Sequence, residues 1–264
     1  MHDTSGFSLI ELLVVCLMSS VVMVGVLKFH AAHNRAQLQQ DALTEVEQNL
    51  RGAMELVTDA VRTSSYFGVE PFHQSALPSP YPSGWLSITQ SPVVTQGATT
   101  ADPDSITVAG CYQEPLTTLS ALADVNQNTL TVADGSGFAA NQMIVIGQIE
   151  SVVVTSVSGN TLSIDTDPST VSREGLEHKF AVGSPVCRVD VVTFAISNGN
   201  LTRALNGAAA VVAVNGIGDM QIVEVEVGKR YDITLRSASR TDPVTNQAFT
   251  RALRSSATVS SWVG

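Results

Sequence analysis

The sequence predicts an α+β fold: a long N-terminal α-helix, membrane-spanning in its first half, packed on an antiparallel β-sheet head with an inserted β-subdomain. Three patterns predict it. Residues 7–27 are almost entirely apolar, residues 28–51 contain neither Gly nor Pro, and β-branched runs separated by turn residues fill the chain from Ser105 onward. The first two patterns favour one continuous helix, and the third favours a sheet.

The composition narrows the class of protein. The chain has 264 residues, with 24 acidic and 14 basic side chains and a net charge of −10. Charged residues make up 14% and hydrophobic residues 44%, whereas ordinary soluble domains are roughly 25% charged. These values argue against a disordered chain, and the acidic balance argues against a nucleic-acid partner.

Residues 7–27 are long enough to cross a membrane, since 21 helical residues extend for about 31 Å. Polar side chains that suit the membrane interface follow directly: Lys28, His30, His33 and Arg35. A secretory signal peptide is disfavoured because the leader has no Lys or Arg and no A-x-A site follows. A plain membrane anchor explains the length but not Glu11, whose carboxylate costs up to about 3 kcal/mol inside a membrane helix.

The string Gly6-Phe7-Ser8-Leu9-Ile10-Glu11, followed by four apolar residues, resembles the N-terminal processing motif of type IV pilins and type II secretion pseudopilins. The resemblance implies that a membrane-embedded prepilin peptidase cuts between Gly6 and Phe7 and N-methylates Phe7. It also implies that Glu11 pairs with the new amine during assembly. Gly6 leaves the scissile bond unhindered, and Glu11 lies one helical turn from Phe7, so the two charges can neutralise each other in lipid.

Two features depart from that family's pattern. The leader, residues 1–6, carries Asp3 where the family usually has Lys or Arg, and no proline precedes Pro71. A proline kink in the helix is therefore not expected.

The helix is expected over residues 7–65, with its transmembrane segment at 7–27. Its second half has an apolar stripe that would pack on the head. The stripe residues are Leu43, Val46, Leu50, Ala53, Met54, Val57, Ala60 and Val61. A proline-rich linker is expected over residues 66–104, which hold six of the ten prolines and one candidate strand near 85–89.

The head is expected over residues 105–264, with the inserted β-subdomain near 124–182. The pattern predicts hairpins at Ser158-Gly159-Asn160 and at Asn198-Gly199. The predicted strands cover residues 105–109, 129–132, 143–146, 151–156, 161–165, 186–196, 201–204, 220–227, 231–237 and 257–261.

Charge is uneven along the head. Residues 102–226 hold 14 acidic and 4 basic side chains, whereas residues 229–254 hold 6 basic and 2 acidic. Two interpretations stay open: the basic segment docks on an acidic face of a neighbouring subunit, or it is a solvated edge hairpin whose arginines prevent aggregation.

The pilin resemblance places the head outside the inner membrane, in an oxidising compartment. Cys111 and Cys187 both lie at ends of predicted strands, so we expect them to form a disulfide; two unpaired buried thiols are the alternative. Cys16 lies in the apolar run and is expected to act as a small hydrophobe.

Chemical sites are not indicated. We expect no catalytic residues, no metal site and no cofactor, because no P-loop, Rossmann, G-x-S-x-G or HExxH pattern occurs. Two short acidic strings, at 102–104 and 165–167, lack the glycine and closing glutamate of an EF-hand and read as turns.

The outline of residues 57–69, with Asp59, Arg62 and Tyr66-Phe67-Gly68, is similar to minor pilins of the PilW type, as are residues 231–240 and 252–260. This resemblance implies a non-enzymatic subunit of the inner membrane, with a periplasmic head, that primes or caps a type IV pilus. The implied partners are other minor pilins, the major pilin, prepilin peptidase, the inner-membrane assembly platform and a tip adhesin.

Two alternatives remain for the function. A J-type pseudopilin of type II secretion is built alike. A membrane-anchored β-domain that binds a ligand uses the same anchor but needs no peptidase.

Overall fold

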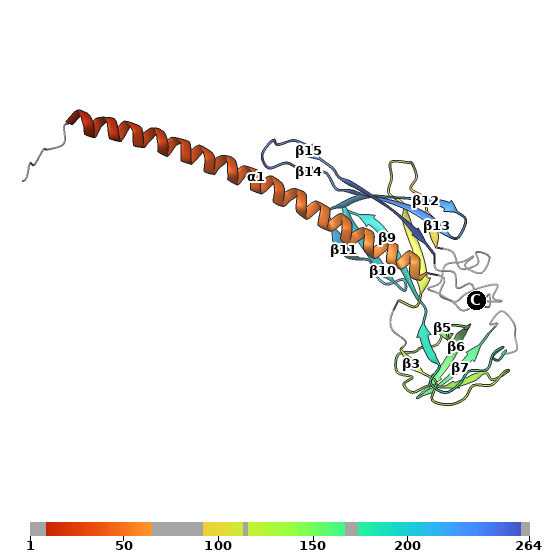
Figure 1. Ribbon diagram of the computed structural model, residues 1–264. Coiled ribbons are helices and arrows are strands. Elements are labelled where there is room, and N and C mark those ends of the chain that lie inside the picture. Colours follow the sequence, from red (N-terminus) through yellow and green to blue (C-terminus); the bar gives the residue numbers. More distant parts are fainter. Residues whose placement is uncertain (1–8, 65–91, 113–115, 167–173, 260–264) are drawn as a thin grey trace, which may run out of the picture. The chain divides into compact units, whose positions relative to one another are not determined.

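The computed structural model confirms an α+β architecture, with one long N-terminal helix followed by antiparallel sheets (Figure 1). The structure describes residues 9–64, 92–112, 116–166 and 174–259. The chain divides into two compact units, which we describe separately. The first comprises residues 1–48 with 239–249, and the second comprises the remainder.

The first unit contains most of helix α1 (Leu9–Thr63) and a short hairpin of β14 (Arg240–Thr241) and β15 (Ala248–Phe249). The helix runs without a break through the apolar residues and the polar residues that follow, as the absence of Gly and Pro from 28–51 predicts. The bounds of the helix agree with the predicted span within the described residues. The helix-exit residues 66–68 and the candidate strand at 85–89 lie outside them.

In the second unit, the last turns of α1 bury the predicted apolar stripe. Ala53, Val57 and Val61 are fully buried. The helix ends close against the sheet: the Tyr112 hydroxyl donates a hydrogen bond to the Ala60 carbonyl at 3.2 Å. A Cβ atom on Gly110 would lie 2.7 Å from the Thr63 carbonyl oxygen, so glycine permits this approach. Burial raises the pKa of Tyr112 far above its ordinary value, so the hydroxyl stays protonated and remains a donor.

Two antiparallel sheets adjoin the helix end. The larger has the order β1-β2-β9-β10-β11, and the smaller has the order β12-β13-β16. The strands of the larger sheet are β1 (Val93–Thr95), β2 (Ser105–Gly110), β9 (Asp190–Ser197), β10 (Asn200–Leu205) and β11 (Val211–Asn215). Those of the smaller sheet are β12 (Ile217–Glu226), β13 (Arg230–Ser237) and β16 (Ala252–Thr258).

A buried carboxylate joins the two sheets. Asp104, 2% exposed, accepts hydrogen bonds from the amides of Gly97 at 2.9 Å and Ile222 at 2.7 Å. Its own amide donates to the Met220 carbonyl at 2.7 Å. The acidic string at 102–104 therefore satisfies the backbone at the edge of β12, in agreement with the turn interpretation.

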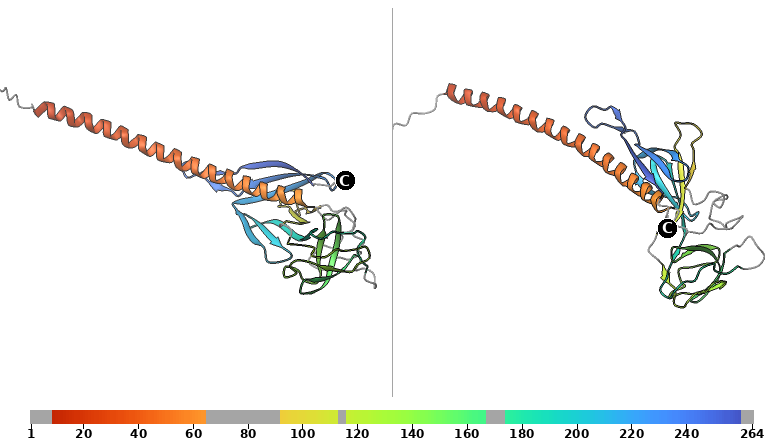
Figure 2. Two further views of the ribbon diagram at one scale, coloured as in Figure 1. Left: turned by 60° about the horizontal axis from the view of Figure 1, so that its bottom comes forward. Right: turned by 45° about the vertical axis from the view of Figure 1, so that its right-hand side comes forward.

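The inserted subdomain is a six-stranded barrel, drawn mainly in green in Figure 1 and from two further sides in Figure 2. Its strand order is β3-β8-β5-β6-β7-β4. A bridge between Leu119 and Val132 joins the two ends of this order, and the Ser120 amide donates to the Thr131 carbonyl beside it at 2.8 Å. The sheet therefore closes on itself around a core that includes Leu130, Ile144 and Ile164. The strands are β3 (Thr117–Thr118), β4 (Thr129–Thr131), β5 (Gln142–Ile146), β6 (Glu150–Ser158), β7 (Thr161–Asp165) and β8 (Pro185–Arg188).

Both predicted hairpins are confirmed. The turn at Asn198-Gly199 has φ angles of 50° and 71° and connects β9 to β10. The turn at 158–160 connects β6 to β7. Residues with positive φ occupy these turns because asparagine and glycine tolerate the left-handed conformation.

Three predictions about strands were wrong. The strand predicted over 186–196 is two strands, β8 and β9, in different sheets, because the chain passes from the barrel to the larger sheet at Val189. The last strand begins at Ala252 instead of residue 257. The subdomain is wider than 124–182, since it starts at β3 and ends with β8. The analysis of the sequence also missed the edge strands β1 and β11.

Candidate functional site

The N-terminal part of α1 is the candidate site. Glu11 is exposed and lies in the first turn of the helix, where a carboxylate interacts favourably with the helix N-terminus. Gly6 and Phe7, the predicted cleavage and methylation residues, lie outside the described residues. The geometry of Glu11 leaves its carboxylate free to accept a cation from another group.

The first half of α1 exposes nearly all of its apolar side chains. Leu9 is 77% exposed, Ile10 is 73% exposed and Phe29, which ends this stretch, is 71% exposed. Of the described residues, α1 is the one helix that is long and apolar enough to cross a membrane. An apolar surface of this length requires lipid or other helices around it, since water would make its exposure costly.

Beyond the apolar stretch, the hairpin of β14 and β15 holds α1 through polar contacts. The Arg240 guanidinium donates two hydrogen bonds to the Glu45 carboxylate, at 2.7 and 2.9 Å. The Gln39 amide donates to Asp242 Oδ2 at 2.7 Å. We call these contacts, between residues 39–45 and 240–242, the helix clasp. A two-pronged arginine–carboxylate pair fixes orientation as well as distance.

The helix clasp changes the interpretation of the basic segment 229–254. Arg240 binds a carboxylate of its own chain, and Lys229 likewise lies 3.1 Å from Glu226. Arg236 lies 3.9 Å from Asp219. Part of the positive charge that the sequence placed there is thus compensated within the chain. The sequence showed both Glu45 and Arg240, but no local pattern indicated that they would meet across 195 residues.

The acidic groups of the clasp have shifted pKa values. The hydrogen bonds and positive charge of Arg240 lower the pKa of Glu45, and the amides of Val244 and Thr245, with Gln39, lower that of Asp242. A carboxyl whose pKa is lowered by folding contributes stability above its ordinary pKa, near 4, and loses it as the pH falls through the lowered value.

We therefore expect the helix clasp to open as the pH falls below about 4, and Glu45→Gln to loosen it at neutral pH. Hydrogen exchange of the Val244 and Thr245 amides, corrected for intrinsic rates, measures this. Glu47→Gln, an exposed neighbour on α1, is the matched control and should leave exchange unchanged. Equal protection in Glu45→Gln and the natural chain would show that the ion pair does not hold the hairpin.

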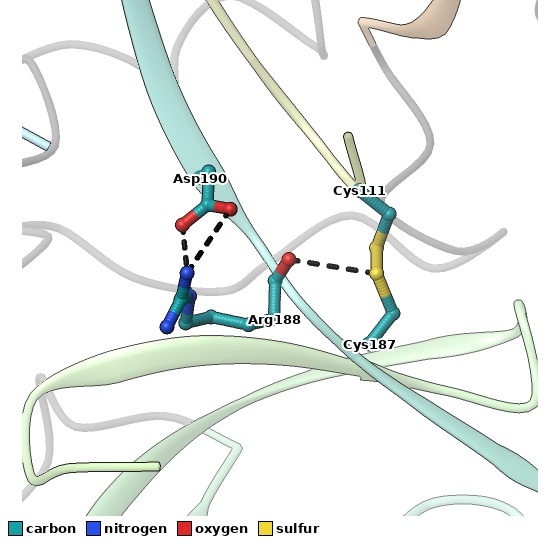
Figure 3. The surroundings of a disulfide bond; sticks show 4 residues. All are labelled: Cys111, Cys187, Arg188 and Asp190. Carbon is teal, nitrogen blue, oxygen red and sulfur yellow. Dashed lines mark hydrogen bonds and ion pairs between the residues drawn. A yellow bond between two sulfur atoms is a disulfide. The ribbon is translucent and has the colours of Figure 1, made fainter. Parts of the chain in front are cut away.

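In the second unit, Cys111 and Cys187 form a disulfide, with Cα atoms 6.0 Å apart (Figure 3). Cys111 follows β2 and Cys187 lies in β8, so the bond ties the entry of the barrel to its exit. Beside it, Arg188 Nε donates to Asp190 Oδ1 at 2.8 Å, and Asn206 donates to the same oxygen at 2.8 Å. These contacts fix the point where the chain returns to the larger sheet. The remaining cysteine, Cys16, is free and exposed on the apolar stretch of α1.

Within the described ranges, no three His, Cys, Asp or Glu side chains are placed to share a metal ion. The acidic group at 165–167 is represented by Asp165, which accepts a hydrogen bond from the Glu174 amide at 3.2 Å. This contact assigns Asp165 a part in a loop of the barrel.

Comparison with known proteins adds one finding. Residues 1–27 match the family described as the prokaryotic N-terminal methylation motif. No curated protein and no solved structure matches the chain. The motif and the exposed apolar helix fit membrane anchoring and support a pilin-like chain, that is, a pilin or pseudopilin subunit in general.

Proposed function

We propose that this chain is a minor pilin of the PilW type, a structural subunit without enzymatic activity that primes or caps a type IV pilus. One observation carries the proposal. The methylation motif, with Glu11 at the start of α1, opens an apolar helix whose side chains are left exposed by the rest of the described chain. Such a surface suits a subunit that lies first in lipid and later among the helices of a filament.

In this proposal, prepilin peptidase cuts between Gly6 and Phe7 and methylates Phe7. The chain then waits in the inner membrane with its head in the periplasm. The Cys111–Cys187 disulfide supports that placement, because disulfides persist in oxidising compartments. The partners would be the assembly platform, the major pilin and other minor pilins, with a tip adhesin beyond them. The pilus would serve twitching motility or adhesion.

The size of the head favours a minor pilin over a J-type pseudopilin of type II secretion. A whole closed barrel is inserted between two adjacent strands of the larger sheet, β2 and β9. A subunit at the end of a filament has room for such an addition, whereas a densely repeated subunit does not.

Intact-mass measurement of the chain from cells with and without prepilin peptidase tests the proposal. We expect loss of the six-residue leader and gain of one methyl group only where the peptidase is present. An unprocessed chain in both strains would contradict the proposal and would favour a membrane-anchored binding domain. Recovery of the processed chain in sheared pili, as opposed to a secretion complex, would separate the pilin from the pseudopilin.

A further inference from the structure

Strand β11 forms an exposed edge of the larger sheet. It pairs with β10, and within the described residues it has no strand on its other side (Figure 1). Val211 and Val212, which point to opposite faces, are 63% and 54% exposed. The edge therefore offers a row of backbone donors and acceptors flanked by apolar side chains, which is the surface that another strand binds.

The chemistry of this edge is unusual for the chain. Residues 204–218 contain no charged side chain and no proline, although the net charge of the chain is −10. Natural proteins block exposed edges with charges, proline or shortening, and β11 shows none of these. The absence of such protection indicates that something covers the edge.

The other sheet edges in the described part of the chain are managed. Strand β16 carries Arg254, and Arg251 directly precedes the strand. Strand β12 is contacted along its edge by Asp104, and β1 has only three residues. The barrel closes on itself. Strand β11 is the described edge that is both five residues long and uncharged.

We propose that β11 pairs with β11 of a second copy of this chain, in an antiparallel pair related by a twofold axis. Pairing about Ala213 places Val212 opposite Val214 in both halves of the pair. Val211 then lies opposite Asn215. No like charges meet, and β-branched residues contact each other across the junction. Two copies of β16, in contrast, would bring arginines together.

The pair goes beyond the proposed function, because a twofold contact is closed and cannot continue along a helical filament. It belongs to the chain stored in the membrane and must separate before a single subunit is incorporated. The uncharged edge also allows close approach of two heads that otherwise repel each other through their negative charge.

Cysteine cross-linking in cells that make the full chain tests the pairing. In a Cys16→Ser background, Ala213→Cys introduces one free thiol at the centre of β11, where opposite residues of an antiparallel pair lie close enough to bond. Under mild oxidation we expect a product of twice the chain mass. Adding Val212→Lys should reduce this product at least tenfold, because two lysines then flank the junction.

Ala252→Cys, at the start of the other edge strand, is the matched control and should not cross-link. Retention of the Cys111–Cys187 disulfide in each variant reports that the head has folded. No product from Ala213→Cys, or equal product from both positions, would overturn the pairing. A product with a different polypeptide would also overturn it and would identify another occupant of the edge. None of these outcomes changes the peptidase result.

Discussion

Replacing Glu11 with valine is expected to leave cleavage and methylation intact but to remove the chain from the filament. The cut lies on the N-terminal side of Phe7, whereas Glu11 sits in the first described turn of α1 with its side chain exposed. After cleavage, the amine of Phe7 is a positive charge that has to enter an apolar surrounding. Without a carboxylate partner, a buried charge of this kind costs on the order of 3–5 kcal/mol.

That cost corresponds to a loss of roughly a hundredfold or more in the equilibrium of incorporation. The measurement compares the amount of the chain in sheared filaments with the amount left in the membrane, together with the intact mass of both fractions. Glu47→Val provides the matched control, because Glu47 is also an exposed glutamate of α1 but lies beyond the apolar stretch. Filaments that contain Glu11→Val at the natural level would remove Glu11 from the assembly step.

The parts of the fold that depend on neighbouring residues were predictable. The apolar stretch, the buried stripe of α1 and the turns at Gly159 and Asn198-Gly199 all have local causes: side-chain periodicity and residues that tolerate positive φ. The exposure of residues 9–29 follows from the same local pattern, since nothing else in the described chain is apolar enough to cover them.

The parts that depend on distant residues were not predictable. Residues 186–196 have uniform β propensity, so the sequence contains no mark at Val189, where the chain changes sheets. The bridge between Leu119 and Val132 closes the barrel through two ordinary apolar residues. The pairing of Glu45 with Arg240 likewise depends on the path of the chain between them.

The architecture around the disulfide explains why its role differs from that of the core. Strands β2 and β9 are hydrogen-bonded neighbours, yet the whole barrel lies between them in the sequence. Folding must bring these two strands together across a long loop, and this costs conformational entropy. A covalent bond at the neck of the insertion reduces that cost by restricting the unfolded chain.

Removal of this bond is therefore expected to give the largest loss of stability in the head. Cys111 and Cys187 are separated by 76 positions, and for a loop of that size the chain-entropy relation gives roughly 4 kcal/mol as an upper value. The double replacement Cys111→Ser/Cys187→Ser avoids leaving one thiol free to form wrong disulfides. Urea unfolding of the full chain in detergent should show a lower midpoint with little change in slope.

Cys16→Ser is the matched control, because Cys16 is free and lies on the exposed stretch of α1, so its midpoint should equal that of the natural chain. A reducing agent should shift the natural chain and Cys16→Ser to the midpoint of the double variant, and leave the double variant unchanged. Mass mapping without reduction that found Cys111 and Cys187 as free thiols would exclude the bond. Equal midpoints for the oxidised and reduced natural chain would show that the neck of the barrel is held by its other contacts, of which the Arg188–Asp190 ion pair is the nearest.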